Sequence, residues 1–159
     1  MIVNVSEPAV RLAGPEDHIV IGGLLDSFNR EFGDPTPGPE KLATRLRQLM
    51  VDGDTAVLLG GGGPDGIAVL RFRRSIWTEG LECYLAELYV APDRRRRGLG
   101  RALMLAAMEL ARERDADYMD LNTGEQDVAA RALYESLGFS RTGGRRDGPV
   151  NYYYERELR

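Results

Sequence analysis

Residues 88–104 read LYVAPDRRRRGLGRALM and pass from a strand pattern to a helix pattern through four arginines and two glycines. The first residues of a helix carry main-chain N–H groups that have no acceptor within the helix, and the positive end of the helix dipole lies beside them. Glycine lets a ligand approach such amides because it has no Cβ. The stretch therefore predicts an anion site at the start of a helix, suited to a phosphate group.

Positive charge is concentrated in this turn although the chain as a whole is acidic. Its 159 residues contain 21 Lys and Arg and 25 Asp and Glu, a formal net charge of −4. The guanidinium groups of residues 94–97 and of Arg101 match the geometry of phosphate oxygens. Because an acidic chain is not typical of a nucleic-acid binder, we expect the turn to serve one polyanionic ligand and no nucleic acid.

Other phosphate motifs fit the turn less well. The loop G-x-x-x-x-G-K-[ST] is absent, because neither its spacing nor its lysine occurs here. The dinucleotide fingerprint G-x-G-x-x-G would need a third small residue where Leu103 stands, although Asp120 lies at a suitable distance to hold a ribose. A dinucleotide site and a basic turn that only caps a helix both stay open on this evidence.

The rest of the chain predicts a mixed sheet with helices packed on it. Hydrophobic periodicity predicts helices over 19–32, 40–51, 98–114 and 128–137. Strands are predicted near the N-terminus, over 55–59, 66–72, 83–90 and 118–121, from 139 onward, and over 150–158. This order is typical of the α/β or α+β class, and the length fits a single domain over 1–159.

Composition excludes several kinds of site. The single cysteine, Cys83, cannot form an internal disulfide, and the single histidine, His18, leaves no cluster for a metal, so we expect no metal cofactor. A catalytic pair of these two residues has no motif to support it, and both are interpreted as structural. No window reaches the ~18 apolar residues of a membrane span, and residues 1–14 lack the pattern of a secretory leader. We expect a cytoplasmic protein without a membrane partner.

Two linked motifs resemble the GCN5-related N-acetyltransferase (GNAT) family. Arg95, Gly98 and Gly100 fill the family's R/Q-x-x-G-x-G/A pattern after a strand that ends in V-x-P. Residues 132–139, ALYESLGF, are similar to its A-L-Y-E-K-L-G-F segment, and the closing YYYEREL is common in such proteins. The resemblance covers residues 83–139 well. It implies a mostly antiparallel, twisted sheet with helices on both faces, and direct transfer of an acetyl group from acetyl-CoA to a primary amine in a ternary complex.

The resemblance also implies where the cosubstrate binds. Main-chain amides of the arginine turn would hold the pyrophosphate, the strand before it would pair with the pantetheine arm, and the Val90 N–H would donate to the thioester carbonyl. Asp127 stands where the family has Asn; it can cap a helix but cannot donate to pantetheine, and Asn122 is a candidate to compensate. The implied cofactor-binding residues are Leu88, Tyr89, Val90, Arg95, Arg96, Arg97, Gly98, Leu99, Gly100, Arg101 and Asp127.

Acetyl transfer needs one group that takes a proton from the amine and one that gives a proton to the thiolate. The resemblance assigns the second role to Tyr134, in the second motif. For the first role it offers Glu87, with Glu82 or a water chain as alternatives. In a regular strand these two carboxylates would lie on opposite faces, and a bulge, which the family often has here, would change that.

Acidic residues near the predicted acceptor side favour a small cationic amine. They are Asp26, Glu31, Asp34, Glu79 and Glu82. The segments FNREFGDPTP and YLAELYV are loosely similar to the aminoglycoside 3-N-acetyltransferase branch, so an aminoglycoside or a polyamine is one candidate acceptor. A protein α-amine or lysine, and a non-catalytic acyl-CoA sensor, stay open as alternatives. The length of the acyl chain that is transferred and the formation of a homodimer also stay open.

Overall fold

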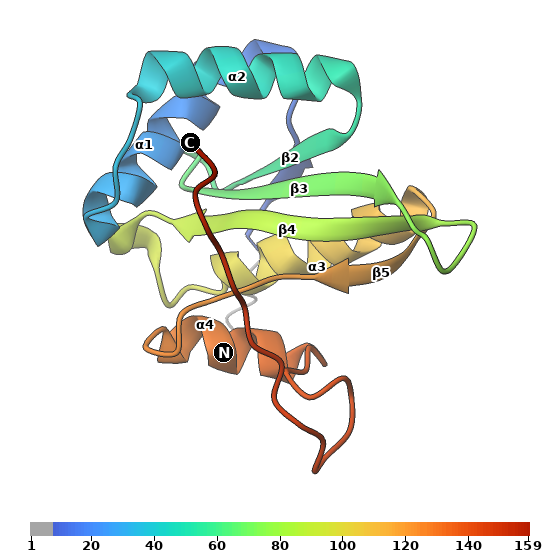
Figure 1. The fold of residues 1–159 in the computed structure, drawn as a ribbon. Helices are drawn as coiled ribbons and strands as arrows, with labels where there is room; N and C mark the ends of the chain where they lie inside the picture. Colours follow the sequence, from blue (N-terminus) through green and yellow to red (C-terminus); the bar gives the residue numbers. More distant parts are fainter. Residues whose placement is uncertain (1–7) are drawn as a thin grey trace, which may run out of the picture. The chain divides into compact units, whose positions relative to one another are not determined.

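The computed structural model describes residues 8–159. One five-stranded sheet has the order β1-β2-β3-β4-β5, with β1 at Val10–Leu12, β2 at Thr55–Gly60, β3 at Gly66–Arg74, β4 at Leu81–Val90 and β5 at Ala116–Asp120 (Figure 1). The helices are α1 (His18–Phe32), α2 (Pro39–Asp52), α3 (Leu99–Glu113) and α4 (Val128–Ser136), with 3-10 turns η1 (Pro15–Asp17) and η2 (Pro92–Arg94). The four predicted helices and the strands predicted over 55–59, 66–72, 83–90 and 118–121 agree with these bounds to within two residues, and β1 is the strand predicted near the N-terminus.

The chain divides into two compact units, one that ends at Met119 and one over Asp120–Arg159. The single domain over 1–159 therefore stays a prediction, and so does the absence of a leader, because residues 1–7 lie outside the described residues.

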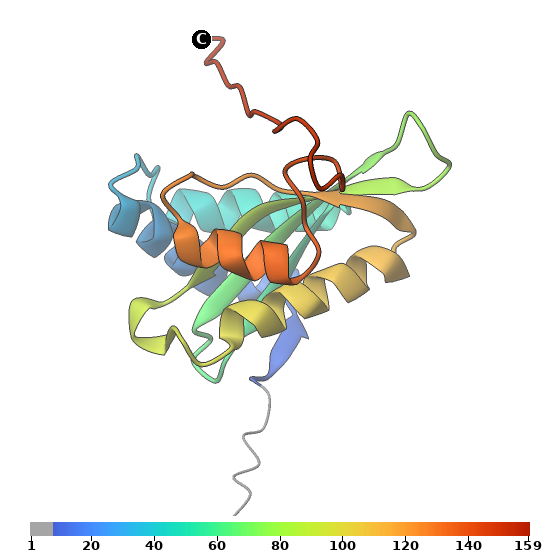
Figure 2. The same ribbon diagram turned by 90° about the horizontal axis from the view of Figure 1, so that it is seen from below.

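The sheet of the first unit is covered by helices on both faces. Strands β1 to β4 pair antiparallel in sequence order. The Leu81 N–H donates to the Asp115 carbonyl at 2.9 Å, which joins the starts of β4 and β5, so these two strands run parallel. Helices α1 and α2 cover one face and α3 covers the other (Figures 1 and 2). This arrangement confirms the predicted mixed, mostly antiparallel sheet.

Side chains alternate along β3 and β4, so each face has its own set. Ile67 and Val69 of β3 pack in one core cluster with Ile21 and Leu25 of α1 and Leu46 of α2. On the α3 face, Leu70 of β3 and Cys83 of β4 are completely buried, as are Leu103, Met104 and Ala107 of α3. These two cores hold β4 in place from both sides, and β4 carries the predicted chemistry.

Helices α1 and α2 cross closely at Gly22, and this contact gives a matched prediction. A Cβ at Gly22 would lie 2.3 Å from the Pro39 carbonyl oxygen and 2.8 Å from the Ala43 nitrogen, which are backbone atoms that cannot rotate away. A Cβ at Gly23 would meet nothing within 4 Å. We expect Gly22→Ala to lower the free energy of unfolding by about 1–3 kcal/mol and Gly23→Ala to raise it by about 0.5–1 kcal/mol, as measured by urea unfolding. Equal effects of the two changes would contradict the close crossing.

The two strands predicted after α4 are wrong: residues 139–159 contain no strand. One main-chain bond joins the two segments, from the Asn151 N–H to the Arg141 carbonyl at 2.7 Å, and no ladder follows it. Instead, the Ser140 hydroxyl accepts bonds from the amides of Thr142 and Gly144, a local turn that competes with a ladder. Because β propensity stabilises a strand only against a packed neighbour, the exposed tyrosines of residues 152–154 do not enforce one.

Candidate active site

A bulge in β4 decides which side chains share a face. Val69 pairs with Glu87, but the next residue, Leu70, pairs with Leu85, so Ala86 is the extra residue. The shift moves the first half of β4 by one residue. Val69 and Arg73 are four residues apart on β3, so their side chains lie on the same face of the sheet. Glu87 pairs with Val69 and Glu82 pairs with Arg73, so both glutamates also lie on that face, toward α1 and α2. The bulge implied by the resemblance is therefore present, and it removes the objection that Glu82 and Glu87 lie on opposite faces.

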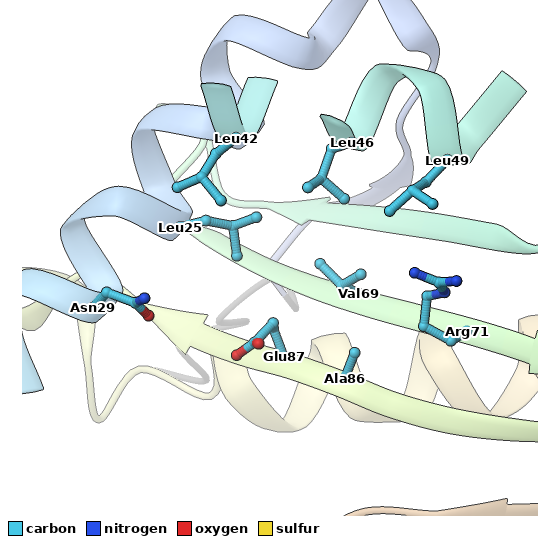
Figure 3. Close-up of a pocket in the computed structure, with 9 residues that line it drawn as sticks. All are labelled: Leu25, Asn29, Leu42, Leu46, Leu49, Val69, Arg71, Ala86 and Glu87. Atoms are coloured by element: carbon cyan, nitrogen blue, oxygen red, sulfur yellow. The ribbon is translucent and has the colours of Figure 1, made fainter. Parts of the chain in front are cut away.

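A pocket of about 200 Å³ opens on this face of the sheet (Figure 3). Its floor is formed by β3 and β4, and its remaining walls come from α1 and α2. Six lining residues are apolar and three are polar: Leu25, Leu42, Leu46, Leu49, Val69 and Ala86, with Asn29, Arg71 and Glu87. The Asn29 amide donates to the Pro35 carbonyl at 2.8 Å, which ties the end of the pocket to the loop after α1.

Glu87 lines the pocket with a carboxyl group whose pKa is shifted. It is half-buried, and none of the described residues gives its carboxylate a hydrogen bond or an ion pair. Burial raises the pKa of Glu87, and the negative charge of Asp34 raises it further. Both causes disfavour the charged form, so Glu87 is a stronger base than an exposed glutamate. A desolvated carboxylate in a pocket is a candidate general base.

Most of the other acidic residues predicted on the acceptor side have structural partners. Asp26, only 8% exposed, accepts bonds from the Arg30 Nε and the Thr36 hydroxyl, both at 2.7 Å, and these partners lower the pKa of Asp26. Glu82 forms an ion pair with Arg73 at 2.6 Å. These carboxylates hold the fold together.

Of the remaining predicted acids, Glu31 is paired with Arg95. Glu79 is exposed in the β3–β4 hairpin. Only Asp34 acts on Glu87, through its charge. Glu87 and Asp34 are therefore the carboxylates that supply negative charge at the pocket.

The second half of β4 has one edge without a strand partner in the first unit. The Ala91 N–H donates to the Asp65 carbonyl at 2.8 Å, and the alternation of an antiparallel ladder then directs the Val90 and Leu88 N–H groups away from β3. β5 has five residues against ten in β4 and begins beside Leu81, so it pairs only with the first half. The Leu88 and Val90 amides are thus two open donors, and Leu88 is adjacent to Glu87.

The arginine turn forms an exposed helix start, as predicted. Gly98 is the N-cap residue of α3, with φ of 81°, and Arg96 also has a positive φ, 63°. The first helical bond is donated by Ala102 to the Gly98 carbonyl, and none of the described residues accepts a bond from the amides of residues 96–100. Residues 95–98 are exposed. Several amides and the helix dipole are therefore available to an anion.

Arg95 differs from its neighbours because its side chain is already engaged. Its guanidinium forms an ion pair with Glu31 of α1, donates from Nε to the Val90 carbonyl at 2.9 Å, and lies over the Tyr89 ring. These contacts tie the end of β4 to α1. The Arg95 side chain therefore positions the strand and is already occupied by contacts within the chain.

In the second unit, the motif ALYESLGF ends α4 and orients Tyr134. The Gly138 N–H donates to Glu135 and the Phe139 N–H to Tyr134, with φ of 90° at Gly138, which is a Schellman motif. Tyr134 is 8% exposed and its ring lies edge-on to Phe139. Burial, and then the charge of Asp127, raise the pKa of Tyr134 to about 12. The phenol therefore keeps its proton at neutral pH.

The helix cap predicted for Asp127 is confirmed. Its Oδ1 accepts a bond from the Ala130 N–H at 3.1 Å, at the start of α4. Its contact with pantetheine stays a prediction, as does the compensating role of Asn122.

The single cysteine and the single histidine both have structural roles. Cys83 is fully buried on the α3 face of β4, whereas a ring nitrogen of His18 contacts the Pro15 carbonyl at 3.0 Å. Within residues 8–159, no three His, Cys, Asp or Glu side chains gather so as to hold a metal ion. No helix in the same part of the chain has both the length and the apolar character needed to cross a bilayer.

Two polar residues of the pocket, Arg71 and Asn29, are not among the residues predicted from the sequence. Arg71 had a readable signal: it is a charged residue within GIAVLRF, at a position of the same parity as Ile67 and Val69. Asn29 had none, because its place in the pocket follows from the packing of α1 on the sheet.

Three comparisons bear on this site. The model of the Acetyltransferase (GNAT) family matches residues 24–139. Mycothiol acetyltransferase of Thermobispora bispora is 46% identical over 67 residues, which cover 40% of this chain and 23% of that protein. Ribosomal protein bS18-alanine N-acetyltransferase of Escherichia coli is 40% identical over 72 residues, 45% of this chain and 46% of that protein. The matched part thus spans less than half the length of these two curated relatives.

A solved structure extends the likeness to nearly the whole chain. A crystal structure named as an acetyltransferase from Arthrobacter sp. FB24 is 42% identical, with a TM-score of 0.86 over 99% of both chains.

Proposed function

Because this chain belongs to the GNAT acetyltransferase family, we propose that it transfers an acetyl group from acetyl-CoA to the primary amine of a small molecule. The observation that carries the proposal is the placement of Glu87: its pairing with Val69 puts its desolvated carboxylate in a pocket, one residue from an open main-chain donor. Base, donor and an anion-binding helix start then follow one another along residues 87–100.

The cosubstrate fits the exposed turn. The pyrophosphate of coenzyme A would accept bonds from the free amides of residues 96–100, and the guanidinium groups of Arg96, Arg97 and Arg101 would add charge. The pantetheine arm would then lie along the open edge of β4, beside Leu88, Tyr89 and Val90. The resemblance implied the Val90 N–H as donor to the thioester carbonyl. Because Leu88 is the open amide adjacent to Glu87, we instead assign the thioester carbonyl to Leu88 and the pantetheine contact to Val90.

The chemistry requires a neutral amine and a stabilised oxyanion. The acceptor ammonium loses a proton to Glu87, directly or through a water, and the free amine attacks the thioester carbon. The carbonyl oxygen becomes an oxyanion, which the Leu88 N–H stabilises. When the intermediate collapses, the C–S bond breaks, the C–N bond remains, and the nitrogen releases its second proton to water. The products are an acetamide and the thiol of coenzyme A.

Tyr134 is the proposed acid for the thiolate. Its pKa of about 12 keeps the phenol protonated at neutral pH, and none of the described residues occupies its hydroxyl with a hydrogen bond. The assignment to this step rests on the family motif that residue 134 fills.

The pocket volume of about 200 Å³ favours a small amine over a folded protein surface. The negative charge of Glu87 and Asp34 suits an ammonium group, which an aminoglycoside, a polyamine or a peptide α-amine would all supply. A non-catalytic acyl-CoA sensor is the alternative of a different class.

The decisive experiment measures thiol release from acetyl-CoA across a panel of small amines and short peptides, with calorimetric titration of coenzyme A alongside. We expect binding of coenzyme A, together with thiol release for some small amines at higher kcat/KM than for peptides. Binding without turnover on any acceptor would favour the sensor. No heat with either acetyl-CoA or coenzyme A would overturn the proposal.

A further inference from the structure

The pocket beside Glu87 has a second charged residue of the opposite sign. Figure 3 shows the Glu87 carboxylate directed toward Asn29 at one end and the Arg71 side chain at the other, with Val69 between them. The leucines of α2 line the side opposite the sheet. The pocket therefore offers a carboxylate, an apolar middle and a guanidinium in sequence.

Among residues 8–159, Arg71 has no partner for its side chain. It is half-buried in β3, on the face that α1 and α2 cover, and none of the described residues gives its side chain a hydrogen bond or an ion pair. The next arginine on the same face, Arg73, is paired with Glu82 at 2.6 Å. A guanidinium that loses part of its hydration without gaining an acceptor is unfavourable, so an anion at this place would bind with little competition. Its planar donors match a carboxylate.

The positions of the two charged residues disfavour an acceptor in which amine and acid are adjacent. Glu87 lies opposite Val69, and Arg71 is two residues farther along β3. Diagonal neighbours of this kind have Cα atoms about 7–8 Å apart. The two charged groups do not converge, because Glu87 is directed toward Asn29 and away from Arg71 (Figure 3). A ligand that meets both must carry several apolar carbons between its charges.

We propose that the preferred acceptor is a primary amine with a carboxylate at the far end of an apolar segment, and that Arg71 binds this carboxylate. The inference rests on the proposed acetyl transfer at Glu87 and narrows its substrate class. It sets the acceptor apart from polyamines and aminoglycosides, because a second ammonium group would face the Arg71 guanidinium. Arg71 does not touch the reacting atoms and acts by binding and positioning.

The test compares amines that differ only at the far end: ω-aminohexanoate, hexylamine and α,ω-diaminohexane, with the shorter and longer ω-amino acids as a length series. We expect kcat/KM to be about 10- to 100-fold higher for ω-aminohexanoate than for hexylamine. This is the gain in binding that a charge-assisted hydrogen bond between Arg71 and the carboxylate provides. The diamine should be the poorest of the three. Most of the difference should lie in KM, because the contact is remote from the reacting nitrogen.

Variants of Arg71 then assign the preference to that side chain. Arg71→Gln should reduce the ratio of ω-aminohexanoate to hexylamine to within about threefold of unity, and Arg71→Glu should reverse it in favour of the diamine. Arg74→Gln is the matched control, since Arg74 is an exposed arginine of the same strand that does not line the pocket, and it should keep the wild-type ratio. Circular dichroism and coenzyme A titration check that each variant is folded.

The outcomes separate this inference from the function on which it rests. Acetylation of hexylamine without any preference for the ω-amino acid, or a preference that survives in Arg71→Gln, overturns the carboxylate site and leaves acetyl transfer intact. Binding of acetyl-CoA without acetylation of any amine overturns both.

Discussion

Replacing Glu87 by glutamine should lower kcat/KM for the best amine by about 10²- to 10⁴-fold, the range that a general base contributes. The amide keeps the shape of the side chain in the pocket but cannot accept the proton of the ammonium group. Binding of coenzyme A should not change, because the glutamate faces the pocket formed by α1, α2 and the sheet. Steady-state kinetics and calorimetry on the same preparations measure the two effects separately.

The pH dependence of the wild type should identify the same group. Burial and the charge of Asp34 raise the pKa of Glu87 above its ordinary 4.5. Below that raised value the carboxyl is protonated and cannot act as a base, so kcat/KM should rise with pH as Glu87 ionises. Comparing wild type and Glu87→Gln with one amine cancels the titration of the substrate itself, and the variant should lack this acidic limb.

A control glutamate distinguishes this role from a general effect of charge. Glu79 is exposed in the β3–β4 hairpin, and Glu79→Gln should retain wild-type kinetics. A Glu87→Gln enzyme with undiminished kcat/KM would show that another group or a water chain is the base.

Tyr134→Phe should lower kcat by about 10²-fold or more while the dissociation constant for acetyl-CoA stays unchanged, because the phenol is proposed to act only when the thiolate leaves. The ring is retained, so its edge-on contact with Phe139 and the end of α4 should survive. Since the Tyr134 pKa is about 12, ionisation of this residue should cause no loss of wild-type activity between neutral pH and pH 10.

Tyr118→Phe is the matched control, because Tyr118 is an exposed tyrosine on β5. It should leave kcat unchanged. If wild type and Tyr134→Phe have equal activity and equal binding of acetyl-CoA, the tyrosine only packs against its neighbours and water protonates the thiolate.

Local features could be predicted from the sequence because their causes lie within a few residues. Hydrophobic periodicity predicted the helices, Gly138 took the positive φ that is common just after a helix end, Gly98 took a positive φ at the start of α3, and Asp127 capped α4 as its side chain allows. The anion-binding turn belongs to this group. Its free amides follow from the geometry of any helix start.

The two strands predicted after α4 were wrong because a strand depends on a partner outside its own segment. Residues 150–158 have the tyrosines and alternation of a strand, but a strand needs a partner that the segment does not itself contain. Turn residues between 140 and 148 formed local bonds instead, among them the Thr142 hydroxyl donating to the Arg145 carbonyl at 2.6 Å.

By itself, the sequence determined the order of the elements as far as α4, the exposed arginine turn and the residues that cap α3 and α4. Only the tertiary structure decided that Glu87 enters a pocket, that Glu82 does not serve as a free carboxylate, and that Arg71 stands at the pocket's far end. The physical reason is register. A one-residue bulge in β4 and the packing of α1 and α2 on the sheet set which side chains lose water and which find a partner, and both depend on contacts between residues far apart in the chain.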